Sequence, residues 1–129
     1  MAACKRPALL VTHSLSNALV ARWVHEANTS GVAGAFLLAP TDLDRLAGTP
    51  EAHSHGFDPI VLRRPPFPSV VAASRDDPRV SVHCAQAFAT AWRSRFFDAG
   101  LLGHIGSAAK LGPWPQGLVL FGQFIQFLG

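Results

Sequence analysis

Cysteine is scarce in this chain, and the two that occur form no recognisable framework. Cys4 and Cys84 are too few for a disulfide scaffold and do not make a C-x-x-C motif. This usage is typical of a reducing compartment, so we expect a cytoplasmic protein. A chain of 129 residues is long enough to bury one core without disulfides or metals. We therefore expect a single domain over residues 1–129.

Charge is also scarce, and it is spread evenly. Charged residues make up 15% of the chain, the formal net charge is +3, and the arginines are scattered instead of forming one stripe. Nucleic-acid binding needs a clustered positive surface, so no nucleic-acid partner is expected. Apolar residues make up 49% of the chain, which favours a folded globular protein over a disordered one.

No apolar run is long enough to cross a membrane. Lys5 and Arg6 precede a short apolar stretch, as in a signal peptide, but Thr12 and the polar residues after it interrupt that stretch. The run "GLVLFGQFIQFLG" at 117–129 is shorter than the about 20 residues that span a bilayer. We expect neither secretion nor a membrane partner, and we interpret the second run as a terminal helix packed on a sheet.

Four apolar runs predict β-strands, and helical spacing follows three of them. The first three runs are nearly continuous in apolar or small residues, as in strands of a parallel sheet covered on both faces. Helical patterns start after Ser14, after the N-cap candidate Ser81, and after Pro115, and the first should end near residues 28–31. This alternation predicts an α/β fold with a mostly parallel sheet. The predicted strands are residues 7–13, 34–39, 68–74 and 94–99.

Residues 40–67 differ from the rest of the chain. They contain several prolines and glycines and little periodicity, which predicts an irregular loop or lid excursion. His53 and His55 of this segment, together with His83 and Cys84, lack a recognised zinc spacing. We therefore expect no metal and no organic cofactor.

The stretch "LLVTHSLSNALVARW", residues 9–23, passes from strand to helix at Ser14 with no ordinary turn sequence between them. Active sites of open parallel sheets lie at the carboxyl ends of the strands. A serine on a sharp strand-to-helix turn at that edge is a nucleophile elbow, whose hydroxyl projects above the sheet. The next backbone N–H, that of Leu15, would stabilise an oxyanion.

A base and an acid for this serine follow the later strands. Asp76 and Asp77 come after the third predicted strand, and His104 lies in a glycine-flanked loop after the fourth. The chain order Ser, Asp, His is that of α/β-hydrolases, so the pattern predicts a serine hydrolase. The pattern leaves open which aspartate orients the histidine.

Four segments, "LVTHSLSNALVARW", "AFLLAPTD", "PPFPSVVAASRDDP" and "GHIGSAAKLGPWPQG", resemble the small serine hydrolase family of the α/β-hydrolase superfamily that includes retinoblastoma-binding protein nine. The resemblance implies a three-layer α/β-hydrolase-type fold and hydrolysis of a small acyl substrate, an ester, thioester or amide, without a cofactor. It assigns Ser14 as nucleophile, His104 as base and Asp77 as acid, because the family's acid usually stands directly before a proline, here Pro78. Asp76 remains the second choice.

The chain departs from that family in two ways. Ser16 stands where the elbow usually has a glycine, so we expect local strain. Thirteen residues precede Ser14, whereas members of the family normally have a longer segment that builds the first strands and the loop with a second oxyanion donor. We therefore expect an N-terminally incomplete domain, a shortened member or the product of a late start codon. Its exposed edge strand would pair with a second copy or a partner chain. The competing hypothesis is a catalytically degenerate interaction protein that uses this strand.

Overall fold

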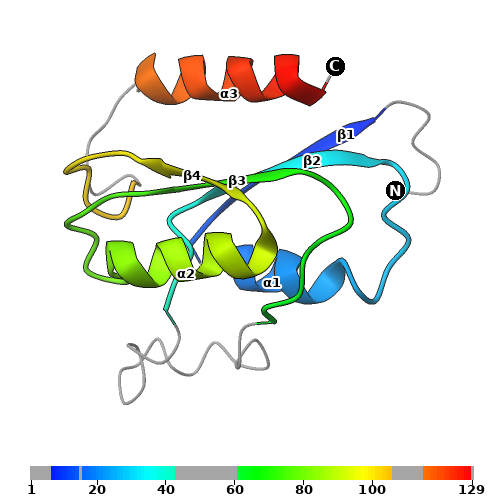
Figure 1. The fold of residues 1–129 in the computed structure, drawn as a ribbon, viewed down its shortest axis with the longest axis horizontal. Helices are drawn as coiled ribbons and strands as arrows, with labels where there is room; N and C mark the ends of the chain where they lie inside the picture. The colour runs from blue at the N-terminus through cyan, green and yellow to red at the C-terminus, as the bar shows by residue number, and fades with distance from the viewer. Residues whose placement is uncertain (1–6, 15, 43–60, 106–114, 129) are drawn as a thin grey trace.

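The computed structural model describes residues 7–14, 16–42, 61–105 and 115–128, which form a parallel sheet and three helices (Figure 1). The predicted order of strands and helices is confirmed. The elements are β1 (Ala8–His13), α1 (Ser16–Trp23), β2 (Val32–Leu38), β3 (Ser69–Ala73), α2 (Val82–Trp92), β4 (Arg95–Asp98) and α3 (Pro115–Leu128).

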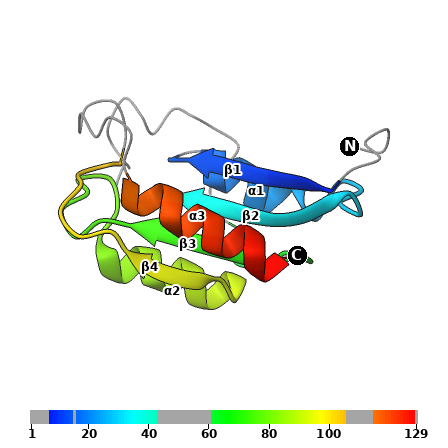
Figure 2. The ribbon, with the colours of Figure 1, turned by 90° about the horizontal axis from the view of Figure 1, so that it is seen from above.

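The four strands pair in chain order, β1-β2-β3-β4, and every pair is parallel. Helices α1 and α2 cover one face of the sheet and α3 lies across the other, so the molecule has three layers (Figures 1 and 2). Because all strands run the same way, their carboxyl ends share one edge of the sheet. The predicted three-layer α/β architecture is confirmed.

The sheet is apolar on both faces because both are covered. All five residues of β3 are buried. Val71 and Ala73 pack with residues of α2 such as Trp92, whereas Val70 lies on the other face with Phe36 and with Phe124 of α3. Burying each of these valine and phenylalanine side chains contributes about 1.5–3 kcal/mol. Two cores, one on each side of the sheet, therefore hold the layers together.

Helix α2 begins and ends where its capping residues stand. The Ser81 hydroxyl accepts a hydrogen bond from the backbone N–H of Cys84 at 3.0 Å, which confirms the predicted N-cap. Arg93 ends the helix in the left-handed conformation, with φ of 54°. Just inside this end, the Trp92 indole N–H donates to the Val61 carbonyl at 2.8 Å and ties the segment before β3 to the helix.

Helix α1 is shorter than predicted. It ends at Trp23, not near residues 28–31. The backbone N–H groups of His25 and Glu26 bond to carbonyls three residues back, those of Arg22 and Trp23, at 3.2 and 2.9 Å. These tightened turns end the α-helix although the apolar spacing continues to Val24.

Gly34 of β2 sets how closely α3 approaches the sheet. A Cβ atom there would lie 2.8 Å from Leu128 Cδ1, 3.0 Å from Phe124 Cζ and 3.0 Å from the Pro68 carbonyl oxygen. A side chain at this position would therefore force the Leu128 and Phe124 side chains or the Pro68 backbone to shift. Gly122, on α3, would meet nothing within 4 Å.

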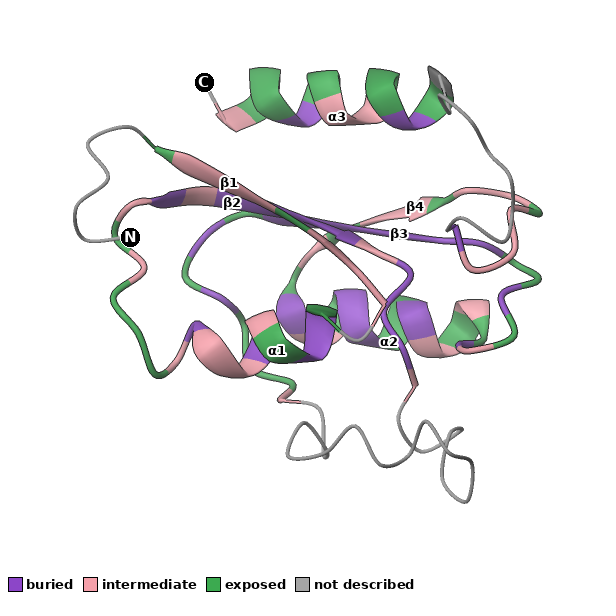
Figure 3. Cartoon of the chain, turned by 180° about the vertical axis from the view of Figure 1, so that it is seen from behind, coloured by how far each residue is buried: buried purple, intermediate pink, exposed green. Residues whose placement is uncertain are grey.

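Helix α3 packs on the sheet through one face only. Phe124 is 4% exposed, which confirms the prediction of a terminal helix packed on a sheet. The outer face of α3 is exposed (Figure 3), and it carries large apolar side chains. Val11 of β1 is another exposed apolar residue. Among the residues that the structure describes, no helix is long and apolar enough to cross a membrane. The exposed large apolar residues of α3 are Leu118, Val119, Ile125 and Phe127.

The predicted excursion at residues 40–67 is described only at its two ends. Residues 43–60 lie outside the described residues, and so do His53 and His55. Residues 61–67, its last part, contain no helix or strand.

Candidate active site

Ser14 occupies a sharp turn directly after β1. Its φ is 61°, in the left-handed region that costs a residue with a side chain about 1–2 kcal/mol. The Ser14 backbone N–H still donates to the Leu38 carbonyl of β2 at 3.0 Å, so the strand pairing extends to the turn itself. Ser16, where we expected strain, begins α1 and is exposed, whereas the positive φ belongs to Ser14.

Asn17 holds this turn from beneath. It is 1% exposed, and its side-chain amide donates to the carbonyls of Ser14 and Leu38, both at 2.8 Å. Its amide oxygen accepts from the Thr12 hydroxyl at 2.6 Å. These bonds tie the last residues of β1 and β2 to the first turn of α1. The strained conformation of Ser14 is thus fixed by a buried polar group that the sequence analysis did not single out.

The His104 imidazole lies between Ser14 and Asp77. Its Nε2 is 2.7 Å from Ser14 Oγ, and its Nδ1 is 2.8 Å from Asp77 Oδ2 and 3.0 Å from Asp77 Oδ1. The side chain of His104 is 18% exposed and that of Asp77 is 0% exposed. A buried carboxylate, an imidazole and a hydroxyl that reaches the surface are therefore joined in one continuous hydrogen-bonded chain.

The two neighbouring aspartates have different contacts. Asp77 Oδ1 also accepts the backbone N–H of Arg79 at 2.8 Å, which fixes the carboxylate that faces the imidazole. Asp76 Oδ1 instead accepts the backbone N–H of Gly103 at 2.8 Å and lies 3.2 Å from the Ser74 hydroxyl. The geometry places Asp77 against His104, whereas Asp76 anchors the loop on which His104 stands.

His13 supports the same loop from β1. Its Nε2 donates to the His104 carbonyl oxygen at 2.7 Å, and the two imidazole rings lie 4.7 Å apart between centroids. The loop needs this support because its backbone is unusual, with positive φ at Gly103 (58°) and at Ile105 (50°). These contacts give His13 an orienting role at this loop.

Thr41 is a member of this group that sequence reasoning missed. Its hydroxyl oxygen lies 2.9 Å from Ser14 Oγ, and the residue is 2% exposed. A signal was present, because Thr41 follows the carboxyl end of β2, the same edge of the sheet that holds the other three side chains. Parallel strands bring every such position to one edge.

The remaining sequence expectations concern the oxyanion donor and a metal site. Leu15, the predicted oxyanion donor, lies outside the described residues. His83 is exposed on α2. In the described parts of the chain, no three histidine, cysteine, aspartate or glutamate side chains are grouped so that they could hold a metal ion.

Comparisons with known proteins point to one family. The chain matches the family described as "Serine hydrolase" over residues 1–123. Among solved structures it is similar to a protein described as a YdeN-like hydrolase from Pectobacterium atrosepticum, with 30% identity and a TM-score of 0.81 over 98% of this chain and 64% of the other. No curated protein matches it.

A second solved structure supports the fold alone. It is the esterase domain of a Rhodothermus marinus protein, with 18% identity and a TM-score of 0.59 over 81% of this chain and 55% of the other. The chain thus spans less than two thirds of the length of either neighbour. Its sheet and helices have the α/β-hydrolase-type fold, and the match over residues 1–123 shows that this chain belongs to the serine hydrolase family.

Proposed function

We propose that this chain hydrolyses a small ester, thioester or amide through an acyl-enzyme on Ser14. The observation that carries the proposal is the hydrogen-bonded chain from Ser14 through His104 to the buried Asp77 carboxylate. The family match supports the reaction class. The sequence resemblance further favours the retinoblastoma-binding protein nine type of serine hydrolase.

The first half-reaction forms the acyl-enzyme. Ser14 Oγ attacks the substrate carbonyl carbon while its proton passes to His104 Nε2, 2.7 Å away. The tetrahedral intermediate collapses when the bond to the leaving group breaks, and His104 gives its proton to that group. The acyl group is then held as an ester on Ser14.

The second half-reaction releases the acid. A water molecule takes the place of the leaving group, and His104 Nε2 accepts a proton from it as its oxygen attacks the acyl carbon. The bond to Ser14 Oγ breaks, His104 returns the proton to that oxygen, and a carboxylic acid leaves. One ester, thioester or amide bond is hydrolysed, and the enzyme is restored.

The neighbouring groups prepare this proton transfer. Asp77 accepts the N–H at His104 Nδ1, which leaves Nε2 free to act as the base and stabilises the imidazolium that forms. When the Ser14 hydroxyl donates to His104, the Thr41 hydroxyl donates to Ser14. From its place in the sequence, Leu15 is the backbone N–H donor that we propose for the oxyanion.

Labelling with a fluorophosphonate probe tests the proposal. The purified chain should be labelled on Ser14, and Ser14→Ala and His104→Ala should abolish labelling while the circular dichroism spectrum is retained. Ser16→Ala is the matched control, because Ser16 is an exposed serine two residues away and should label like wild type. A folded wild-type chain that does not label, or labelling that survives in Ser14→Ala, would reject the proposal.

One observation favours a second candidate, an interaction protein. In the described residues β1 pairs only with β2, and Val11 on this edge strand is 55% exposed. Unpaired edge strands pair readily with another chain. If this is the function, Val11→Lys should lower self-association or partner binding in sedimentation velocity, and Ser14→Ala should leave it unchanged. The scarcity of cysteine supports a cytoplasmic location for either candidate.

A further inference from the structure

A hollow lies at the end of the sheet opposite Ser14. Its floor includes Ser69 and Arg95, the first residues of β3 and β4, whereas Ser14 follows the last residue of β1. Because the strands are parallel, these positions are at opposite ends of the sheet. The hollow has a volume of about 450 Å³, which is large enough for a small organic molecule.

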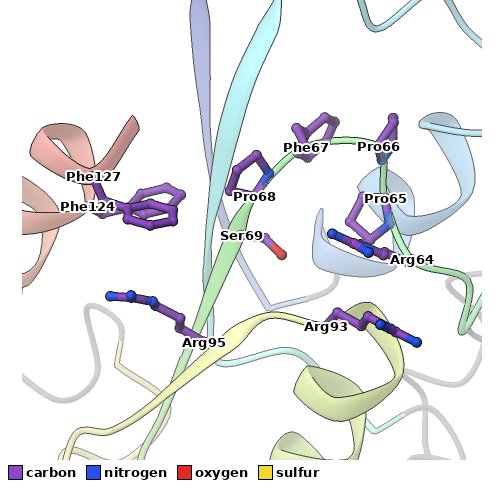
Figure 4. A pocket seen from close by; sticks show the side chains of 10 residues that line it. All are labelled: Arg64, Pro65, Pro66, Phe67, Pro68, Ser69, Arg93, Arg95, Phe124 and Phe127. Carbon is purple, nitrogen blue, oxygen red and sulfur yellow. The ribbon is translucent and has the colours of Figure 1, made fainter. Parts of the chain in front are cut away.

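Three arginines from separate elements line this hollow (Figure 4). Arg64 precedes β3, Arg93 ends α2, and Arg95 begins β4. No aspartate or glutamate of the described chain lines it, so its charge is uncompensated at the wall. Guanidinium groups bind phosphate and carboxylate oxygens in paired hydrogen bonds, so the charge predicts an anionic ligand.

The remaining walls are apolar and aromatic. Phe124 and Phe127 of α3 face the hollow from one side, and a proline-rich segment that contains Phe67 lies above it (Figure 4). The Arg95 guanidinium lies over the Phe127 ring, 4.6 Å from its centroid. An inorganic anion alone would leave these apolar walls unfilled. The walls therefore favour a ligand with both an anionic and an aromatic or other apolar part.

Arg93 occupies a helix-end position where a glycine would make the protein more stable. Its φ of 54° is the left-handed conformation that glycine adopts without a Cβ penalty at helix ends. An arginine there costs backbone strain but places a long cationic side chain at the hollow. The strained backbone at Arg93 is therefore an independent reason to assign the positive charge of Arg93 a role in binding.

We propose that this arginine-lined hollow binds a small phosphate monoester that carries an aromatic or other apolar group. Figure 4 shows the guanidinium groups of Arg93 and Arg95 directed to opposite sides, so these exposed side chains turn toward the phosphoryl oxygens when the ligand binds. The rings of α3 and the prolines contact the apolar group. A dianionic phosphoryl group suits several guanidinium groups better than a single carboxylate does. The binding does not depend on the chemistry proposed for Ser14.

Titration calorimetry on the full chain tests this site, with phenyl phosphate as the probe. Phenyl phosphate should bind, inorganic phosphate should bind at least about tenfold more weakly, and phenol should give no heat. Each of Arg64→Gln and Arg93→Gln should weaken phenyl phosphate binding by about tenfold, since each removes a charge-assisted contact. Phe127→Ala should lower phenyl phosphate affinity toward that of inorganic phosphate.

Arg63→Gln is the matched control for Arg64→Gln. Arg63 is the adjacent exposed arginine and does not line the hollow, so its replacement changes the net charge equally and should leave binding unchanged. Equal losses in both variants would overturn the proposal, because binding would then follow net charge alone. Absence of phenyl phosphate binding to the folded chain would also overturn it.

Sedimentation with vesicles distinguishes the sources of such a ligand. Binding to phosphatidic acid vesicles, but not to phosphatidylcholine vesicles, that is lost in Arg64→Gln and kept in Arg63→Gln would identify a lipid phosphomonoester at this site. Binding of phenyl phosphate without vesicle binding would identify a free phosphate ester. Vesicle binding that is equal in both variants would reject a lipid at the hollow.

Discussion

The exchange Asp77→Asn should slow fluorophosphonate labelling of Ser14 by about 10³–10⁴-fold. The reason is the direction of one hydrogen bond. Asp77 Oδ1 accepts the Arg79 N–H at 2.8 Å, so an asparagine keeps its oxygen there and places its NH₂ group at the Oδ2 position, 2.8 Å from His104 Nδ1. An N–H that faces Nδ1 moves the imidazole proton to Nε2. The ring then donates to Ser14 and no longer acts as its base.

The size of the effect follows from the same geometry. A loss of 10³–10⁴-fold corresponds to about 4–5.5 kcal/mol of transition-state stabilisation. The fold should be little affected, because asparagine has nearly the volume of aspartate and the bond to Arg79 is kept. The assay is the second-order rate constant for labelling, measured by intact-mass spectrometry, with the thermal midpoint as a check on folding.

Asp76→Asn is the matched control for this prediction. It makes the same chemical change one residue away, where the carboxylate bonds to the Gly103 N–H and does not contact the imidazole. Its asparagine oxygen can still accept that N–H, so labelling should slow by no more than about tenfold, the equivalent of 1.4 kcal/mol. A larger loss in Asp76→Asn than in Asp77→Asn would refute the assignment of the acid.

Four further substitutions test the surrounding structure. Gly34→Ala should lower the free energy of unfolding by about 1–3 kcal/mol, because its methyl group collides with side chains of α3. Gly122→Ala, on the open side of that helix, should raise the free energy of unfolding by about 0.5–1 kcal/mol. A denaturant titration that ranks the two variants in the other order contradicts this packing of α3 on the sheet. Hydrogen bonds from the Gly100 N–H and from the Arg75 guanidinium lower the pKa of Asp98 below its ordinary value of 3.8. Ionised Asp98 thus stabilises the folded state above the unfolded pKa, and that contribution disappears as the pH falls through the lower folded pKa. Asp98→Asn should therefore reduce the thermal midpoint at neutral pH. The difference in thermal midpoint between wild type and variant should shrink below about pH 3.9. A difference in midpoint that is constant with pH would disprove this account. His13→Leu should keep the fold but slow Ser14 labelling by about tenfold through loss of its bond to the His104 carbonyl, and an unchanged rate would show that the loop needs no such support.

Much of the fold could be predicted from local patterns. Continuous apolar runs identified the strands because a parallel sheet covered on both faces has no polar side. Ser81 identified the start of α2 because an N-cap acts within three residues of its own position. The end of α1 was predicted too late because apolar spacing continues through turns that are no longer α-helical.

The candidate site was predictable only in part, for the same physical reason. Ser14, Asp77 and His104 each follow a strand, and that position is visible in the sequence. The roles of Asn17 and Thr41 depend on contacts between segments that are distant along the chain, such as the bond from Asn17 to the Leu38 carbonyl. The choice between Asp76 and Asp77 likewise depends on which carboxylate the turn after β3 directs toward the imidazole, and spacing alone does not specify that direction.

The parallel order of the strands has a consequence for how this site comes into being. Neighbouring parallel strands cannot be joined by tight hairpins, so each pairing must close a long loop before it gains stability. Ser14 and His104 are 90 residues apart in the chain, yet their side chains meet across the carboxyl edge of the sheet. The constellation therefore cannot form in a fragment or in a partly folded chain. Reactivity at Ser14 is accordingly a reporter of complete folding. In a refolding experiment it should appear only after the last strand has joined the sheet, later than the burial of Trp92 of α2 against β3.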